Sequence, residues 1–81
     1  MRINARLFAV LRDKAGTDSL VLDVTEGCTA AQASASLLEC LPQLRPFADA
    51  AMLAVNLEYV EPDHIMREGD ELALIPPVSG G

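Results

Sequence analysis

Apolar and polar residues alternate over the first ten positions of the chain. One face of a strand over residues 2–10 would carry Ile3, Ala5, Leu7 and Ala9, and the other face Arg2, Asn4, Arg6, Phe8 and Val10. This period of two predicts a strand with one buried side. Phe8 then lies on the largely polar side, where a large aromatic ring is unexpected.

A second alternating run follows a short polar stretch. Residues 12–18, which include Gly16, indicate a polar connection, and Leu20, Leu22 and Val24 then alternate with more polar neighbours. We expect the two strands to pair as a hairpin with a rather long loop.

The middle of the chain carries the pattern of one amphipathic helix. Thr29 is followed three residues later by Gln32, which fits a capping box at a helix start. The apolar stripe that follows consists of Ala30, Ala33, Leu37 and Leu41. Pro42 cannot continue the helix and ends it. The pattern predicts a helix over residues 30–41.

The second half of the chain predicts three further strands. Residues 44–51 are expected to be irregular or a short helical turn, with Phe47 in the core. The predicted strands cover residues 52–56, 59–60 and 71–75, with turns at 57–58, 62–64 and 67–70. In the last strand Leu72 and Leu74 are predicted to face inward, and Ala73 and Ile75 outward.

This order of elements predicts an α+β fold with a mixed sheet of four to five strands and one main helix packed on one face. If the last strand runs parallel to the first at the sheet centre, a right-handed crossover is expected. That arrangement is the ubiquitin-like β-grasp. One domain would span residues 1–75, followed by an extended tail over residues 76–81.

The predicted topology places Phe8 and Ile75 side by side on the face that the helix does not cover. Val10 and Tyr59 would extend this apolar patch. An exposed apolar patch beside the root of the tail is a candidate docking surface. The alternative is a set of unrelated surface hydrophobes, which are common on soluble domains.

The end of the sequence is a candidate chemical handle. From Leu72 to Gly81 no side chain is charged, and the last two residues are Gly80 and Gly81. Glycine lacks a Cβ, so such an end can enter a narrow slot and leave its carboxyl carbon open to attack. Pro76 and Pro77 lack backbone donors and favour an extended approach to that end. The alternative is a frayed terminus.

Composition narrows the possible functions. Twelve acidic residues against six basic ones argue against a nucleic-acid binder, whose affinity comes from Lys and Arg. Six acidic residues crowd the stretch before the tail: Glu58, Glu61, Asp63, Glu68, Asp70 and Glu71. They suggest a basic partner surface or simply a solvated acidic rim. With no apolar run of membrane-spanning length, we expect a cytoplasmic protein that binds no membrane.

The two cysteines are predicted to be free thiols. A helix over residues 30–41 would separate Cys28 from Cys40 by roughly 18 Å, beyond the reach of about 7 Å between the Cα atoms of a disulfide. Ordinary packing is the favoured interpretation for Cys28, and Cys40 is expected to be a small core residue. The spacing of these cysteines and His64 predicts no metal site.

Two segments resemble a known family. The run Leu7-Phe8-Ala9-Val10-Leu11-Arg12 with Gly16, and Glu68-Gly69-Asp70-Glu71-Leu72 leading to Pro76-Pro77-Val78-Ser79-Gly80-Gly81, are similar to the small subunits of molybdopterin synthase. These subunits are ubiquitin-like sulfur carriers. The sulfur carrier of the thiamine pathway shares the fold and the Gly-Gly end, and is the second alternative.

The resemblance implies a cycle carried by Gly81. A ubiquitin-activating-like adenylyltransferase would adenylate its carboxylate with ATP, and a sulfur donor enzyme would convert it to a thiocarboxylate. The tail, residues Pro76, Pro77, Val78, Ser79 and Gly80, would then enter the large subunit of a heterotetramer of two small and two large chains. Sulfur would pass there to cyclic pyranopterin monophosphate in molybdenum cofactor biosynthesis.

The same resemblance makes this chain a co-substrate rather than a catalyst. It implies no metal and no cofactor bound by the chain, with ATP used by the activating enzyme. Phe8 and Ile75 match positions that contact the large subunit. Two functions of other classes stay open: a protein modifier joined to lysines through Gly81, and a plain interaction domain with an inert tail.

Overall fold

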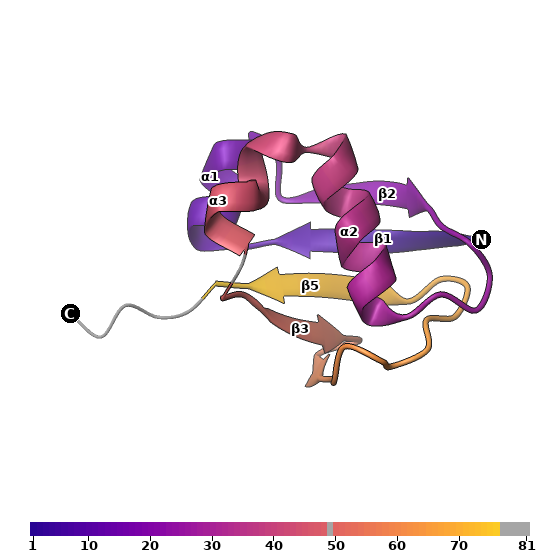
Figure 1. Ribbon diagram of the computed structural model, residues 1–81. Helices are drawn as coiled ribbons and strands as arrows, with labels where there is room; N and C mark the ends of the chain where they lie inside the picture. The colour runs from indigo at the N-terminus through magenta and orange to yellow at the C-terminus, as the bar shows by residue number, and fades with distance from the viewer. Residues whose placement is uncertain (49, 77–81) are drawn as a thin grey trace.

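Five strands form one mixed sheet in the order β2-β1-β5-β3-β4. The computed structural model describes residues 1–48 and 50–76. The elements run in the order β1 (Arg2–Leu7), α1 (Ala9–Ala15), β2 (Ser19–Asp23), α2 (Ala30–Cys40), the 3₁₀-helix η1 (Pro42–Leu44), α3 (Arg45–Ala48), β3 (Met52–Val55), β4 (Glu58–Tyr59) and β5 (Glu71–Ile75). Helix α2 crosses one face of the sheet (Figure 1).

The register confirms the predicted β-grasp arrangement. Strand β1 pairs antiparallel with β2, as the expected hairpin, and parallel with β5 through Leu7 opposite Leu74. Strand β3 pairs antiparallel with β5 and with β4. Because β1 and β5 are parallel, their carboxyl ends lie at the same end of the sheet, where α1 and α3 also gather (Figure 1).

The core lies between the sheet and α2. The inward residues of β1 and β5 and the stripe of α2 are almost completely buried: Ile3, Ala5, Leu7, Leu72, Leu74, Ala30, Ala33 and Leu37. Full burial of each large aliphatic side chain contributes about 1.5–3 kcal/mol. The two alanines let α2 approach the strands closely, because they place only a methyl group between backbone and sheet.

The local signals for α2 are confirmed. The Gln32 backbone N–H donates to Thr29 Oγ1 at 3.1 Å, and the Thr29 N–H donates to Gln32 Oε1 at 2.9 Å. The helix ends at Cys40, one residue earlier than predicted, and Pro42 begins η1. Cys28 is buried and Cys40 is exposed, so the expected core position of Cys40 is wrong: the end of α2 leaves it in solvent.

The first strand is shorter than predicted, and the expected polar connection over residues 12–18 is largely helix α1. The chain leaves the sheet at Phe8, whose carbonyl accepts from the N–H groups of Leu11 and Arg12. Gly16 closes α1 in the left-handed conformation, with φ of 77°. Leu11 is fully buried and secures the helix. The five residues from Leu7 to Leu11 are all apolar, and such a short run does not by itself distinguish a strand from the start of a short helix.

The remaining elements follow the prediction closely. The short helical segment appears as η1 and α3, and Phe47 is half-buried against the core. Strand β4 begins one residue earlier than predicted. Its turn consists of Asn56 and Leu57, both with positive φ, so β3 and β4 form a two-residue hairpin of the type I′ class.

Candidate functional site

Two buried alanines mark the second face of the sheet, away from α2. Ala54 of β3 lies opposite Ala73 of β5 in the register, and the two residues are 4% and 7% exposed. Neither belongs to the core cluster beneath α2. The predicted outward orientation of Ala73 therefore agrees with the structure. Other residues on the outer face shield both methyl groups from solvent.

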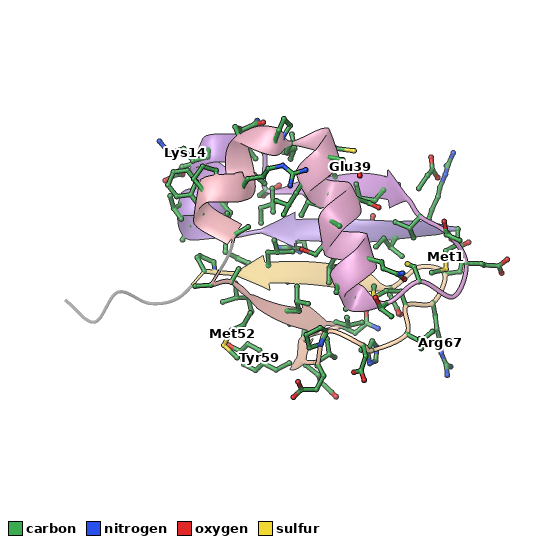
Figure 2. The ribbon with its side chains drawn as sticks, viewed as in Figure 1. Met1, Lys14, Glu39, Met52, Tyr59 and Arg67 are labelled. Atoms are coloured by element: carbon green, nitrogen blue, oxygen red, sulfur yellow. The ribbon has the colours of Figure 1, made fainter. Side chains whose placement is uncertain are left out.

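An apolar hollow of about 160 Å³ lies above these alanines. It is lined by Phe8, Ala54, Leu57, Tyr59, Ala73 and Ile75, and is here called the Phe8–Ile75 hollow. Its walls come from three segments that are distant in sequence: the residue that follows β1, the β3–β4 hairpin and the end of β5. Tyr59 lies near Met52 at the β3–β4 edge of the sheet (Figure 2).

The register explains how these residues meet. Leu7 of β1 pairs with Leu74 of β5. Successive side chains point to opposite faces of a sheet, so the residues that follow this pair, Phe8 and Ile75, lie side by side on the face away from α2. Tyr59 pairs with Ala54 across the β3–β4 hairpin. The structure thus brings together three of the four residues proposed for a partner interface.

Val10 is the exception. It lies in α1, half-buried, and packs against the main core. The prediction placed it on the Phe8 face by extending the strand through residue 10, but the chain has already turned into a helix. Leu57, which sequence reasoning assigned only to a turn, lines the hollow instead. The signal that could have identified Leu57 from the sequence is the presence of a large apolar residue in a two-residue turn.

Phe8 occupies an unusual position in the backbone. It is the N-cap residue of α1, with an extended conformation (φ −129°, ψ 156°), and it makes no side-chain hydrogen bond to the helix. Ser, Thr, Asp and Asn are the residues that stabilise this position. The phenyl ring is 37% exposed at the rim of the hollow. Phe8 therefore contributes apolar surface at a position where a polar residue would stabilise the helix.

Arg6 adds a charge beside the hollow. Its guanidinium lies 5.8 Å from the centre of the Phe8 ring and 3.6 Å from the Glu71 carboxylate, measured from Nη1 to Oε2. Exposed contacts of this kind contribute at most about 1 kcal/mol each. They place the Arg6 guanidinium next to one of the residues that line the hollow.

Several acidic residues before the tail have structural roles. Asp70 Oδ1 accepts from Asn56 Nδ2 at 2.9 Å, and Asp70 Oδ2 accepts from the Arg67 N–H at 2.9 Å. Glu68 Oε2 accepts from the Arg2 N–H. These bonds hold the turn that leads into β5. The hypothesis of a basic partner surface stays a prediction and concerns chiefly the exposed residues Glu58, Glu61 and Asp63.

The predicted tail begins at this site. Pro76, half-buried, follows Ile75 directly. The other predicted tail residues, Pro77, Val78, Ser79, Gly80 and Gly81, lie outside the described residues. Any protein that takes hold of the chain just after Ile75 therefore meets the Phe8–Ile75 hollow beside it.

Over residues 1–48 and 50–76, every helix is too short or too polar to cross a membrane. The histidine, cysteine and acidic side chains of the same residues do not gather in threes as a metal site requires. His64 is exposed in a turn.

A sequence model of the ThiS family matches residues 5–81. The chain belongs to the ThiS family. Among its relatives is the molybdopterin synthase sulfur carrier subunit of Arabidopsis thaliana, 36% identical over the whole of this chain and 84% of the relative. The resemblance noted from the sequence is therefore confirmed.

Solved structures agree with this family assignment. The small archaeal modifier protein 1 (SAMP1) of Haloferax volcanii is 31% identical, with a TM-score of 0.92 and complete coverage of both chains. A chain in the complex of subunits 1 and 2 of the Helicobacter pylori molybdopterin-converting factor has a TM-score of 0.73, with complete coverage of both chains, at 20% identity. That likeness supports the fold, which is the ubiquitin-like β-grasp of the family.

Proposed function

We propose that this chain is the sulfur carrier subunit of a molybdopterin synthase. The observation that carries the proposal is the relationship, over the full length of the chain, to sulfur carrier subunits of that enzyme. The Phe8–Ile75 hollow supports it, because it provides an apolar docking surface at the root of the Gly-Gly tail.

The chemistry resides in the carboxyl group of Gly81. Its oxygen attacks ATP in an activating enzyme, pyrophosphate leaves, and the carboxyl becomes an acyl adenylate. A sulfur donor enzyme then delivers sulfur at the oxidation level of sulfide to the acyl carbon. AMP leaves with one of the former carboxyl oxygens, and Gly81 carries a thiocarboxylate. Adenylation supplies the leaving group, and the resulting sulfur is a stronger nucleophile than a carboxylate oxygen. The large subunit holds the precursor, cyclic pyranopterin monophosphate, and the sulfur is transferred to that precursor.

The hollow would be the contact with the large subunit. Aromatic residues in a partly desolvated depression are the usual anchors of a protein interface, and Phe8 and Tyr59 form the walls of this one. A partner that covers the hollow would orient the tail toward its own active site. We propose a heterotetramer of two small and two large chains as the assembled enzyme.

Intact mass spectrometry tests the carrier function directly. The chain is incubated with ATP, the activating enzyme and a sulfur source, and the expected product is heavier by the difference between sulfur and oxygen. A variant lacking Gly80 and Gly81 serves as the matched control and stays unmodified. If that truncated chain still supports molybdopterin formation with the large subunit, the proposal is wrong.

A second function is favoured by one specific observation. The structural match to a small archaeal modifier protein, at a TM-score of 0.92, supports a protein modifier joined to lysines through Gly81. Incubation with ATP and an extract of the source cells separates the two functions. A modifier gives a ladder of larger conjugates that hydroxylamine at neutral pH does not cleave, whereas a carrier gives none.

A further inference from the structure

The turn between β3 and β4 is strained at Leu57. Its φ is +72°, in the left-handed region, where a branched side chain meets the backbone. Two-residue turns of this class strongly prefer Asn-Gly. The chain has the favoured Asn56 at the first position, but a leucine in place of glycine at the second.

Elsewhere the chain places glycine where the backbone is left-handed. Gly16, Gly27 and Gly69 have φ of 77°, 79° and 82°. Apart from Asn56, which tolerates this region, the exceptions among the described residues are Ala9 and Leu57. Ala9 directly follows Phe8, and Leu57 lines the hollow. One strained residue therefore lines the hollow and the other is the sequence neighbour of a residue that does, and backbone strain is often retained at functional sites.

Leu57 also exposes almost its whole side chain. At 88% it is the most exposed large hydrophobic residue that the structure describes. The isolated domain thus accepts a strained backbone and a solvated apolar side chain at one position, and neither contributes to folding. A benefit in binding accounts for both.

We propose that Leu57 is a specificity-determining contact of the synthase large subunit, and that it inserts into an apolar pocket of that partner next to the Phe8–Ile75 hollow. This inference rests on the proposed function. The large subunit fits better than the activating enzyme, because long-lived subunit interfaces are more apolar than transient encounters. The exposed Glu58, adjacent in sequence, predicts a basic residue at the rim of that pocket.

Leu57→Gly and Leu57→Asn test the proposal, because both residues tolerate the left-handed backbone. We expect a melting temperature equal to or above that of the wild type, together with an increase of about tenfold in Kd for the large subunit by titration calorimetry. Thiocarboxylation by the activating enzyme should be unchanged. Val21→Thr is the matched control, since Val21 is an exposed residue of edge strand β2 that does not line the hollow, and it should leave Kd unaltered.

The outcomes separate this inference from the proposed function. An unchanged Kd for both Leu57 variants overturns the inference, as does a loss confined to thiocarboxylation. Phe8→Asp in the same titration reports on the hollow itself. If it weakens binding and the Leu57 variants do not, only the role of Leu57 fails. If the wild-type chain does not bind the large subunit, the proposed function fails and the inference with it.

Discussion

Replacing Phe8 by aspartate separates the binding role of this residue from its role in the fold. Phe8 contributes apolar surface to the hollow and is also the uncapped N-cap residue of α1. Aspartate removes the ring, but its carboxylate can accept from the N–H groups of Val10 or Leu11 in the first turn. Alanine removes the ring and supplies no cap. The two variants therefore differ in a defined way.

The magnitudes follow from burial and capping. Phe8 is 37% exposed, so about two-thirds of its burial is already realised in the isolated domain. With full burial worth about 1.5–3 kcal/mol, Phe8→Ala should lower the free energy of unfolding by about 1–2 kcal/mol. An aspartate cap returns about 1 kcal/mol, helped by the helix dipole. Phe8→Asp should melt about 4–8 °C above Phe8→Ala.

Thermal and urea unfolding of the purified variants measure this difference. Binding to the large subunit should follow the opposite order: Phe8→Asp binds more weakly than Phe8→Ala, because a carboxylate would have to be desolvated in an apolar contact. Adenylation of Gly81 remains possible in both. The capping argument is wrong if the aspartate variant is the less stable one. Unaltered assembly with either variant would remove Phe8 from the interface.

Four further changes test the fold and the site. Thr29→Ala breaks the capping box of α2 and should cost about 1 kcal/mol in urea unfolding; an unchanged midpoint would contradict that role. Leu72→Ala empties a fully buried position of the central strand and should cost about 2–5 kcal/mol, whereas a loss below about 1 kcal/mol would show a core able to collapse. Val10→Ala should destabilise the domain by about 1 kcal/mol and leave Kd for the large subunit unchanged, and weaker binding at equal stability would restore Val10 to the interface. Deleting Gly80 and Gly81 should abolish sulfur loading without changing the melting temperature; a lower melting temperature would indicate that the tail packs on the domain.

The elements that the pattern predicted well are those specified by neighbouring residues. Thr29 and Gln32 form the capping box of α2 within one turn, and Pro42 marks its end, so no distant contact was needed to place the helix. Strand β5 was equally clear, because its alternating residues lie between a turn and a proline. The prediction around residue 9 was wrong because no neighbouring residue specifies the element there. The apolar run from Leu7 to Leu11 fits both a strand and a short helix, and the burial of Leu11 against the rest of the fold decides between them.

Some of the residues that line the hollow could be predicted from the sequence alone. The prediction that Phe8 and Ile75 share a face needed only the two-residue period of strands and one assumption, that the last strand runs parallel to the first. That assumption is correct. Val10 was misplaced because the first strand was predicted to extend to residue 10, whereas β1 ends at Leu7. Leu57 was missed because a turn residue is assigned to solvent by default.

Local chemistry in the chain therefore specified most of the secondary elements, α1 excepted, since caps, alternation and prolines act over a few residues. The glycine end is likewise a property of the sequence itself. Tertiary structure alone decided that the predicted neighbours on the outer face do meet and that Val10 is not among them, because β-sheet register joins residues more than sixty positions apart, such as Leu7 and Leu74. It also decided that Leu57 borders the hollow in a strained turn, because the tight hairpin between β3 and β4 forces that backbone conformation.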